Sequence, residues 1–213
     1  VSDSGVAVEG RLLGRLSVSM SDNLLPYDGE LYFNAALLET AESDALYSRL
    51  RESIDWEQRS ISLFGKRMLQ PRLIAWHGDV GANYRYSGAD YIAQPWTPEL
   101  SLLRQRVEDH FKRRFNSVLL NYYRDGNDSM GWHRDNERQL GDRPAIASIN
   151  LGATRLFKLQ HVTSKALRKI ELVSGSAILM AGYCQQHWRH CVPKQKGIMD
   201  GRINLTFRYI EQN

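Results

Sequence analysis

Apolar residues recur at helical spacing in the first half of the chain. In residues 40–56, Leu46, Leu50 and Ile54 follow one another every four positions, which places them on one face of a predicted amphipathic helix. Thr40 stands at the start of this segment, where we expect it to act as the N-cap. Acidic residues follow in the first turn, as is typical of helix starts.

A second helix is predicted over residues 97–115. Thr97 is its expected N-cap, and Pro98 follows at once, where the fixed backbone angle of proline suits the first helical position. One side of this helix is expected to carry an apolar stripe of Leu102, Leu103, Val107, His110 and Phe111.

The rest of the chain has the pattern of short, closely spaced strands, separated by glycine, asparagine and aspartate. The predicted strands are 57–64, 72–77, 82–87, 117–123, 146–151, 155–160, 168–173, 176–181 and 202–210. Two helices among many strands indicate an α+β, mainly β chain, with helices packed on one face of a double sheet or barrel. Residues 1–27 show little pattern, so we treat them as an N-terminal extension of a domain spanning 28–213.

Composition says only a little about the partners and the cellular compartment of the protein. The net charge of +4 tolerates a polyanionic partner without requiring one. The longest apolar run, around residues 177–181, is far too short to cross a bilayer, so we expect no membrane partner. Cys184 and Cys191 make no disulfide framework, which favours a reduced, intracellular protein. We expect a monomer, cytoplasmic if the source is bacterial and nuclear if it is eukaryotic.

The stretch MGWHRDNERQ, residues 130–139, places His133 and Asp135 two positions apart. On an extended segment, residues i and i+2 point to the same face, so the two side chains can reach one ion. A kinase-like catalytic loop would need an asparagine five positions after the aspartate, and that position holds Leu140. Two neighbouring polar residues without function are the alternative to a metal site.

A metal site needs a third ligand, and the downstream stretch QQHWRHCVPKQ offers His187 and His190. Two imidazoles and one carboxylate leave open positions on an octahedral ion, which is typical of non-haem Fe(II) oxygenases. Zinc accepts the same ligand types, so residue type alone leaves both metals open.

The segment GRINLTFRYI alternates strictly. Its polar residues share one strand face: Arg202, Asn204, Thr206 and Arg208. Its apolar residues share the other: Ile203, Leu205, Phe207 and Tyr209. A strand with one wet face would show the same pattern, but the two arginines lie roughly 20 Å apart along a strand, which leaves room for a short dicarboxylate between their side chains. With Asn121 and Tyr123 of LLNYYRDG, they form an anion site that suits an α-ketoacid cosubstrate.

Six pieces of the sequence resemble, in order, the AlkB family of Fe(II)/2-oxoglutarate-dependent dioxygenases, most closely the branch of the eukaryotic nuclear DNA-repair homologues. The pieces, within residues 57–210, are LFGKRMLQPR, YRYSG, FNSVLLNYYRDGNDSMGWHRDNE, PAIASINLGATRLF, HWRH and RINLTFR. The resemblance implies a double-stranded β-helix (jelly roll) with buttressing helices. It also implies an added substrate-recognition hairpin within a nucleotide-recognition lid over residues 57–90.

The resemblance places the Fe(II) ligands at His133, Asp135 and His190, and leaves His187 a structural role. The implied reaction consumes 2-oxoglutarate and O₂, hydroxylates the N-methyl group of 1-methyladenine or 3-methylcytosine in DNA, and releases formaldehyde, succinate and CO₂. The DNA would be single-stranded or duplex, and RNA is a further possible substrate. An AlkB-like RNA or protein demethylase and a non-catalytic lesion-binding module are the alternatives.

Five residues are assigned by the resemblance to the cosubstrate. Arg202, helped by Tyr123, would hold the carboxylate of 2-oxoglutarate that lies far from iron. Arg208 and Asn204 would lie near the carboxylate that chelates iron, and Asn121 would support the cosubstrate.

Five more residues are assigned to the nucleic acid. Tyr84 and Tyr86 would line the pocket for an extruded base, and Glu137 would favour cationic lesions by its charge. Phe64, at a hairpin tip, would fill the gap left by the extruded base in duplex DNA, and Arg72 would contact the backbone nearby.

Overall fold

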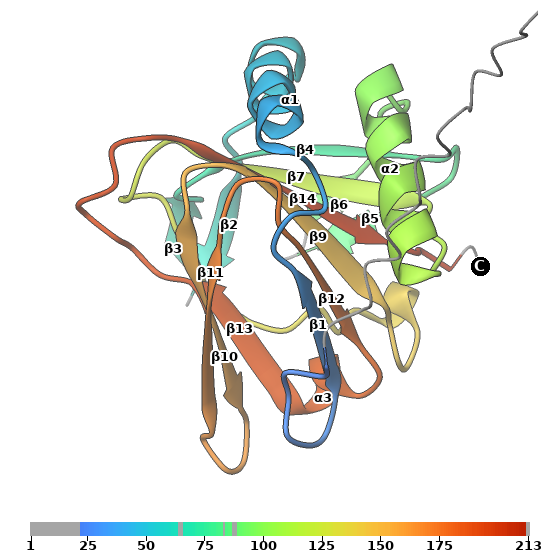
Figure 1. The fold of residues 1–213 in the computed structure, drawn as a ribbon, viewed down its shortest axis with the longest axis vertical. Helices are drawn as coiled ribbons and strands as arrows, with labels where there is room; N and C mark the ends of the chain where they lie inside the picture. Colours follow the sequence, from blue (N-terminus) through green and yellow to red (C-terminus); the bar gives the residue numbers. More distant parts are fainter. Residues whose placement is uncertain (1–21, 64–65, 83, 87–88, 212–213) are drawn as a thin grey trace, which may run out of the picture.

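Strands dominate the computed structural model, which describes residues 22–63, 66–82, 84–86 and 89–211 (Figure 1). Its helical elements are α1 (Thr40–Ser53), α2 (Pro98–Phe111), α3 (Cys184–His187) and a 3-10 turn, η1 (Arg138–Leu140). No helix in these ranges is long and apolar enough to cross a membrane.

Two antiparallel sheets hold most of the strands. The larger has the order β1 (Glu30–Asn34), β12 (Ala177–Ala181), β9 (Ile146–Gly152), β14 (Arg202–Arg208), β7 (Ser117–Tyr123) and β4 (Leu73–Gly78). The smaller has the order β11 (Leu167–Leu172), β10 (Arg155–His161), β13 (Trp188–Val192) and β8 (Met130–His133). Two hairpins lie within the predicted lid: β2 (Ser60–Leu63) with β3 (Lys66–Leu69), and β5 (Tyr84–Tyr86) with β6 (Ala89–Tyr91).

The larger sheet separates two apolar cores, because side chains alternate between the faces of each strand. On β14, Ile203, Leu205 and Phe207 join the core that includes the buried faces of α1 and α2. The opposite face looks toward the smaller sheet across the second core, which holds Phe157 and Trp188. Figure 1 shows α1 and α2 on one side of the larger sheet and the smaller sheet on the other. This arrangement confirms the predicted jelly roll with buttressing helices.

The starts of the two long helices agree with the sequence to within one residue. Thr97 caps α2 as predicted, its Oγ1 accepting a hydrogen bond from the Leu100 amide at 3.3 Å. Thr40 is already the first residue of α1, and Glu39 is its N-cap, without a side-chain hydrogen bond. The predicted stripe on α2 was wrong at Leu102, which is 52% exposed. The buried residues of α2 are Leu100, Leu103, Val107 and Phe111.

Residues 22–27, the end of the predicted extension, pack against the domain in the structure. Leu25 is buried, and the Tyr27 ring contacts His161 and Trp188. The Trp188 indole also donates a hydrogen bond to the Tyr27 carbonyl at 3.1 Å. These contacts join the segment to the smaller sheet. Because the segment is held by tertiary contacts and is neither helix nor strand, its sequence shows no periodic pattern of apolar residues. Residues 1–21 lie outside the described ranges.

A candidate metal centre beside an anion pocket

Two histidines from neighbouring strands begin the site. His133 ends β8, and it pairs across the sheet with His190 in β13, so the two rings lie with centroids 4.2 Å apart. Asp135 lies two residues beyond the end of β8 and is 1% exposed. One ligand atom from each of these three residues lies within 4.8 Å of the others. The structure therefore brings together the three predicted iron ligands.

Asp135 is held from two sides. An Arg208 Nη2 donates to its Oδ2 at 3.0 Å, and its own backbone amide donates to the Gln185 side-chain oxygen at 3.0 Å. Burial alone would raise the pKa of the carboxyl, but Arg208 and the two histidines outweigh burial and hold the pKa below its usual range. The second carboxylate oxygen, Oδ1, is buried and accepts no hydrogen bond within the described residues. Such an atom suits a metal.

The two histidines are held in the neutral form, which is the form that binds a metal. Burial lowers the pKa of His133 and lowers the pKa of His190 to about 3, and in both cases it is the largest cause. The His133 Nδ1 donates to the Gly131 carbonyl at 2.8 Å, which leaves the Nε2 lone pair free to bind a metal. Two neutral imidazoles and one ionised carboxylate fit Fe(II) with open positions.

A second group of metal-ligand types, Asp28, His161 and His187, has a different character. The Ser164 amide donates to the His161 Nδ1 at 3.0 Å, so in the neutral ring the Nε2 carries the proton. That Nε2 lies 3.2 Å from the Asp28 carboxylate. A protonated nitrogen does not bind a metal, so this group is a polar cluster that holds the N-terminal segment to β10. His187 lies in it, apart from the predicted iron ligands.

A pocket of about 540 Å³, including its part open to solvent, lies between the sheets at this centre. Every residue predicted to bind the metal or the cosubstrate lines it: Asn121, Tyr123, His133, Asp135, His190, Arg202, Asn204 and Arg208. Strand register explains why, because β7, β14 and β9 are neighbours. Arg202 is opposite Tyr123, and Asn204 is opposite Asn121.

Arg202 fits an anion at the end of β14 away from Arg208. It is 1% exposed, and its Cζ lies 5.0 Å from the centre of the Tyr123 ring. An Nη2 donates to the Asn150 side-chain oxygen, whereas Nε and Nη1 have no hydrogen-bond partner within the described residues. Burial lowers its pKa to about 10. A carboxylate would satisfy both the unpaired donors and the buried charge.

Two polar residues of β9 that contact Arg202 or Asn204 were not singled out from the sequence. Asn150 accepts from Arg202 and from Asn204 Nδ2, the latter at 3.1 Å, and Ser148 Oγ is a second acceptor for Asn204. They lie two positions apart in the otherwise apolar strand β9. That polar alternation was visible in the sequence and could have marked them.

The residues assigned to the nucleic acid fare differently. Arg72, predicted to contact DNA, is 4% exposed and donates to the Asn121 side chain at 2.8 Å, so the structure does not present it at the surface. Glu137 is half-buried, precedes η1, and does not line the pocket. Phe64 lies outside the described residues, and the side chains of Tyr84 and Tyr86 are likewise outside them. For all five residues, a role in binding the nucleic acid stays a prediction.

The jelly roll, the enclosed histidines with their aspartate, and the buried arginine define a non-haem Fe(II) oxygenase site with an α-ketoacid pocket. The sequence pattern of the 2OG-Fe(II) oxygenase superfamily matches residues 30–208. Fe(II), 2-oxoglutarate and O₂ are therefore the cofactor and cosubstrates of this chain.

Similar proteins narrow the class. The chain is 36% identical over 185 residues to a mouse protein named DNA oxidative demethylase ALKBH2, covering 82% of this chain and 77% of that protein. It is 37% identical over 183 residues to the rat alpha-ketoglutarate-dependent dioxygenase alkB homolog 3, covering 81% of this chain and 61% of that protein. The chain belongs to the AlkB family of 2OG-Fe(II) oxygenases.

A solved structure agrees at the level of the fold. The structure of OsALKBH1 superposes with a TM-score of 0.62 at 16% identity, covering 84% of this chain and 96% of that one. At this identity the likeness shows the fold alone.

Proposed function

We propose that this protein is an oxidative demethylase that repairs N-alkylated bases in DNA, with 1-methyladenine and 3-methylcytosine as the expected lesions. The observation that carries the proposal is the enclosed group of His133, Asp135 and His190, one end of a pocket that Arg202 also lines. The names of the mouse relative and its homologues support DNA as the substrate. We place the reaction inside the cell, where the buried free thiols of Cys184 and Cys191 stay reduced.

The chain's own residues would divide the work. Bound iron and 2-oxoglutarate supply, with O₂, the oxidising power that hydroxylates the N-methyl group. His133, Asp135 and His190 would hold the metal, while Arg208 keeps the Asp135 carboxylate ionised and oriented. Arg202 would bind the cosubstrate carboxylate that points away from the metal.

The test is demethylation of matched oligonucleotides carrying 1-methyladenine or 3-methylcytosine. Formaldehyde and the restored base should both appear, and only when Fe(II), 2-oxoglutarate and O₂ are present. DNA and RNA of the same sequence should be compared, each single-stranded and as a duplex. Turnover of RNA alone would replace DNA as the substrate. Tight binding of methylated DNA without succinate release would point to a lesion-binding module.

Preference for duplex DNA is a finer part of the proposal, and it depends on Phe64. If Phe64 fills the gap left by an extruded base, Phe64→Ala should lose activity on duplex DNA, because extrusion costs a few kcal/mol that stacking offsets. Activity on single strands and the Tm should stay near wild type. Equal losses on both substrates, or a large fall in Tm, would make Phe64 a structural residue and remove this argument for duplex DNA.

A further inference from the structure

We infer that Arg72 is a positioning residue for the cosubstrate, because it fixes the side-chain amide of Asn121 so that its NH₂ group faces the pocket. The inference rests on the proposed function in taking 2-oxoglutarate as the molecule that fills this pocket. It does not depend on which nucleic acid is demethylated.

Arg72 is enclosed behind the pocket wall. It is 4% exposed, and Asn121 is 6% exposed. The Arg72 Nε donates to the Asn121 Oδ1 at 2.8 Å, and an Nη1 lies 3.4 Å from the Ser129 carbonyl. Asn121 lines the pocket, whereas Arg72 does not. Arg72 therefore touches the pocket only through its neighbour.

The chemistry of the two groups decides which way the amide points. A guanidinium has only donors, and an asparagine side chain has an acceptor oxygen at one end and a donor NH₂ at the other. Contact with Arg72 therefore requires Oδ1, which turns the Asn121 Nδ2 away from the arginine. A flipped amide would set NH₂ against a buried cation and present its oxygen to an anionic cosubstrate.

The hydrogen bonds that the described residues make to the neighbouring asparagines leave only Asn121 with a side-chain NH₂ group available for a ligand. Three asparagines form a row across adjacent strands, since Asn204 pairs with both Asn121 and Asn150. The Asn204 oxygen accepts from Thr206 Oγ1 at 2.9 Å, and its nitrogen donates to Asn150 and Ser148. The Asn150 nitrogen lies 3.3 Å from acceptors on Ser176. In the described part of the chain, only the Asn121 NH₂ of this row has no acceptor.

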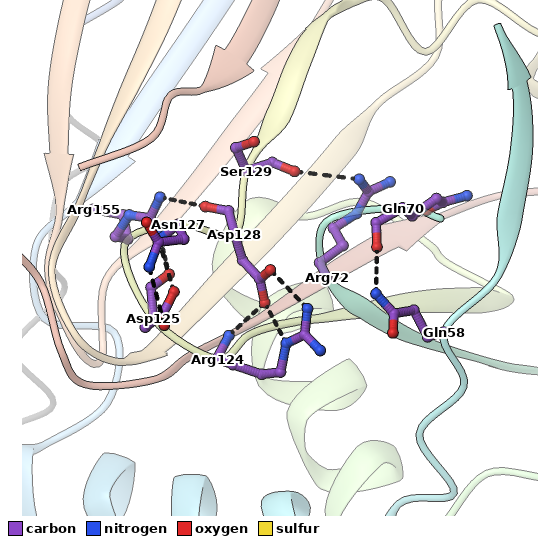
Figure 2. Close-up of polar contacts among 9 residues, drawn as sticks. All are labelled: Gln58, Gln70, Arg72, Arg124, Asp125, Asn127, Asp128, Ser129 and Arg155. Carbon is purple, nitrogen blue, oxygen red and sulfur yellow. Dashed lines mark hydrogen bonds and ion pairs between the residues drawn. The ribbon is translucent and has the colours of Figure 1, made fainter. Parts of the chain in front are cut away.

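The backbone around Arg72 fixes its place. The turn Gln70–Arg72 joins β3 to β4, and the Ser129 amide donates to the Pro71 carbonyl at 2.9 Å. At the other side the Gln58 side chain donates to the Gln70 carbonyl at 3.0 Å. Figure 2 shows Arg72 reaching Ser129 and Gln58 reaching Gln70. Arg72 thus links the cosubstrate strand β7 to the loop that leads into β8, which ends at His133.

A double-mutant cycle on 2-oxoglutarate binding tests the inference. Arg72→Met, Asn121→Ala and the double variant are loaded with Fe(II) without O₂ and DNA, and the Kd for 2-oxoglutarate is measured by titration. We expect Arg72→Met and Asn121→Ala each to weaken binding about tenfold, because each removes or misdirects one donor to an anion. The double variant should bind no worse than Asn121→Ala alone, because Arg72 acts through Asn121.

Additive losses, or an unchanged Kd in Arg72→Met, would overturn the inference, since a lost charge acts whether or not Asn121 is present. Fe(II) affinity should not fall, because the Arg72 side chain donates to Asn121 and Ser129 and to none of the three metal ligands. If Arg72→Met does not fold, Arg72→Lys decides. Lysine keeps the charge but not the planar fork, so about threefold weaker binding at wild-type Tm upholds the inference, and wild-type binding overturns it.

Arg124→Gln is the matched control. Arg124 lies in the loop between β7 and β8, which also holds Ser129. It pairs with Asp128 at 2.8 Å, and its side chain is 44% exposed (Figure 2). The variant should leave the Kd for 2-oxoglutarate within about twofold of wild type, because the Arg124 side chain donates to Asp128 and does not line the pocket. Because the assay contains no DNA, its outcome is independent of whether methylated DNA is the substrate, which the turnover assay decides separately.

Discussion

The two faces of β14 are equally buried, but one packs in a core and the other lines a pocket. On the side of the helices, Leu205 and Phe207 are 0% exposed, and on the side of the smaller sheet Arg202 is 1% and Arg208 3% exposed. The apolar face is complete as folded, because its contacts are already made. On the polar face, Arg202 keeps two donor atoms without partners in the described residues. Unsatisfied buried polarity, rather than burial, separates a site from a core.

The largest expected effect comes from the metal centre, which lies against the polar face of β14. Asp135→Ala should abolish turnover and weaken Fe(II) binding, because it removes the only anionic ligand and leaves two imidazoles. Succinate formation and Fe(II) affinity are the measurements. Asp28→Ala is the control, since Asp28 lies in the other His and Asp cluster, and it should leave Fe(II) affinity unchanged. Full 2-oxoglutarate turnover by metal-loaded Asp135→Ala would remove Asp135 from the metal centre.

On the apolar face a truncation should cost stability rather than binding. Phe207→Ala should lower the free energy of unfolding by roughly 3–5 kcal/mol, because it leaves a cavity in the core beneath the helices. Urea unfolding measures this. The Kd for 2-oxoglutarate, measured where the variant is still folded, should stay within about threefold of wild type, since the Phe207 side chain lies on the face of β14 opposite the pocket. A large loss of binding at full folding would mean that the two faces are coupled.

Arg202→Ala is the converse case on the same strand. It should raise the KM for 2-oxoglutarate by roughly 10- to 100-fold, equivalent to a lost charge-assisted contact of about 1.5–3 kcal/mol. Affinity for methylated DNA should hardly change. Stability should fall less than in Phe207→Ala, because the buried charge of Arg202 is poorly compensated in the free protein. An unchanged KM would remove Arg202 from the cosubstrate site.

The same contrast explains what could be predicted from the sequence. The residues of β14 and β7 were placed correctly because they lie inside long strands, where alternation assigns each side chain to a face. The strand ends at Arg208, however, so Tyr209, predicted on the apolar face, is 53% exposed. Periodicity says which face a residue takes, and it says little about where a strand stops.

The metal ligands were harder, since β8 and β13 were not predicted as strands. Met130–His133 is too short to show alternation, and Asp135 lies beyond its end. The position of Asp135 depends on Gln185, fifty residues away in the sequence, and on Arg208. The ligand types and the family motif found these residues, whereas local pattern could not. The contact of Arg72 with Asn121 was missed for the same reason, because it is a tertiary contact that local pattern does not show.

The smallest expected effect tests the one buried polar side chain on the helix-side face of β4. His77 is 4% exposed, and its Nδ1 donates to the Pro95 carbonyl at 2.7 Å. Burial lowers its pKa from 6.5, outweighing that hydrogen bond and Asp55, which raise it. As pH falls below 6.5, the unfolded chain therefore gains a proton that folded His77 does not, and the free energy of unfolding must fall.

His77→Asn keeps a donor near the Nδ1 position and removes the titration. We expect the free energy of unfolding of the variant to depend less steeply on pH below 6.5 than that of the wild type. Other histidines, such as His110, whose pKa burial also lowers, leave some slope in both proteins, so the difference between the two curves is the quantity to measure. Parallel curves from urea unfolding would mean that His77 titrates alike in both states. The apolar face would then tolerate a charge there, and the contrast between the faces of the larger sheet would weaken at its edge.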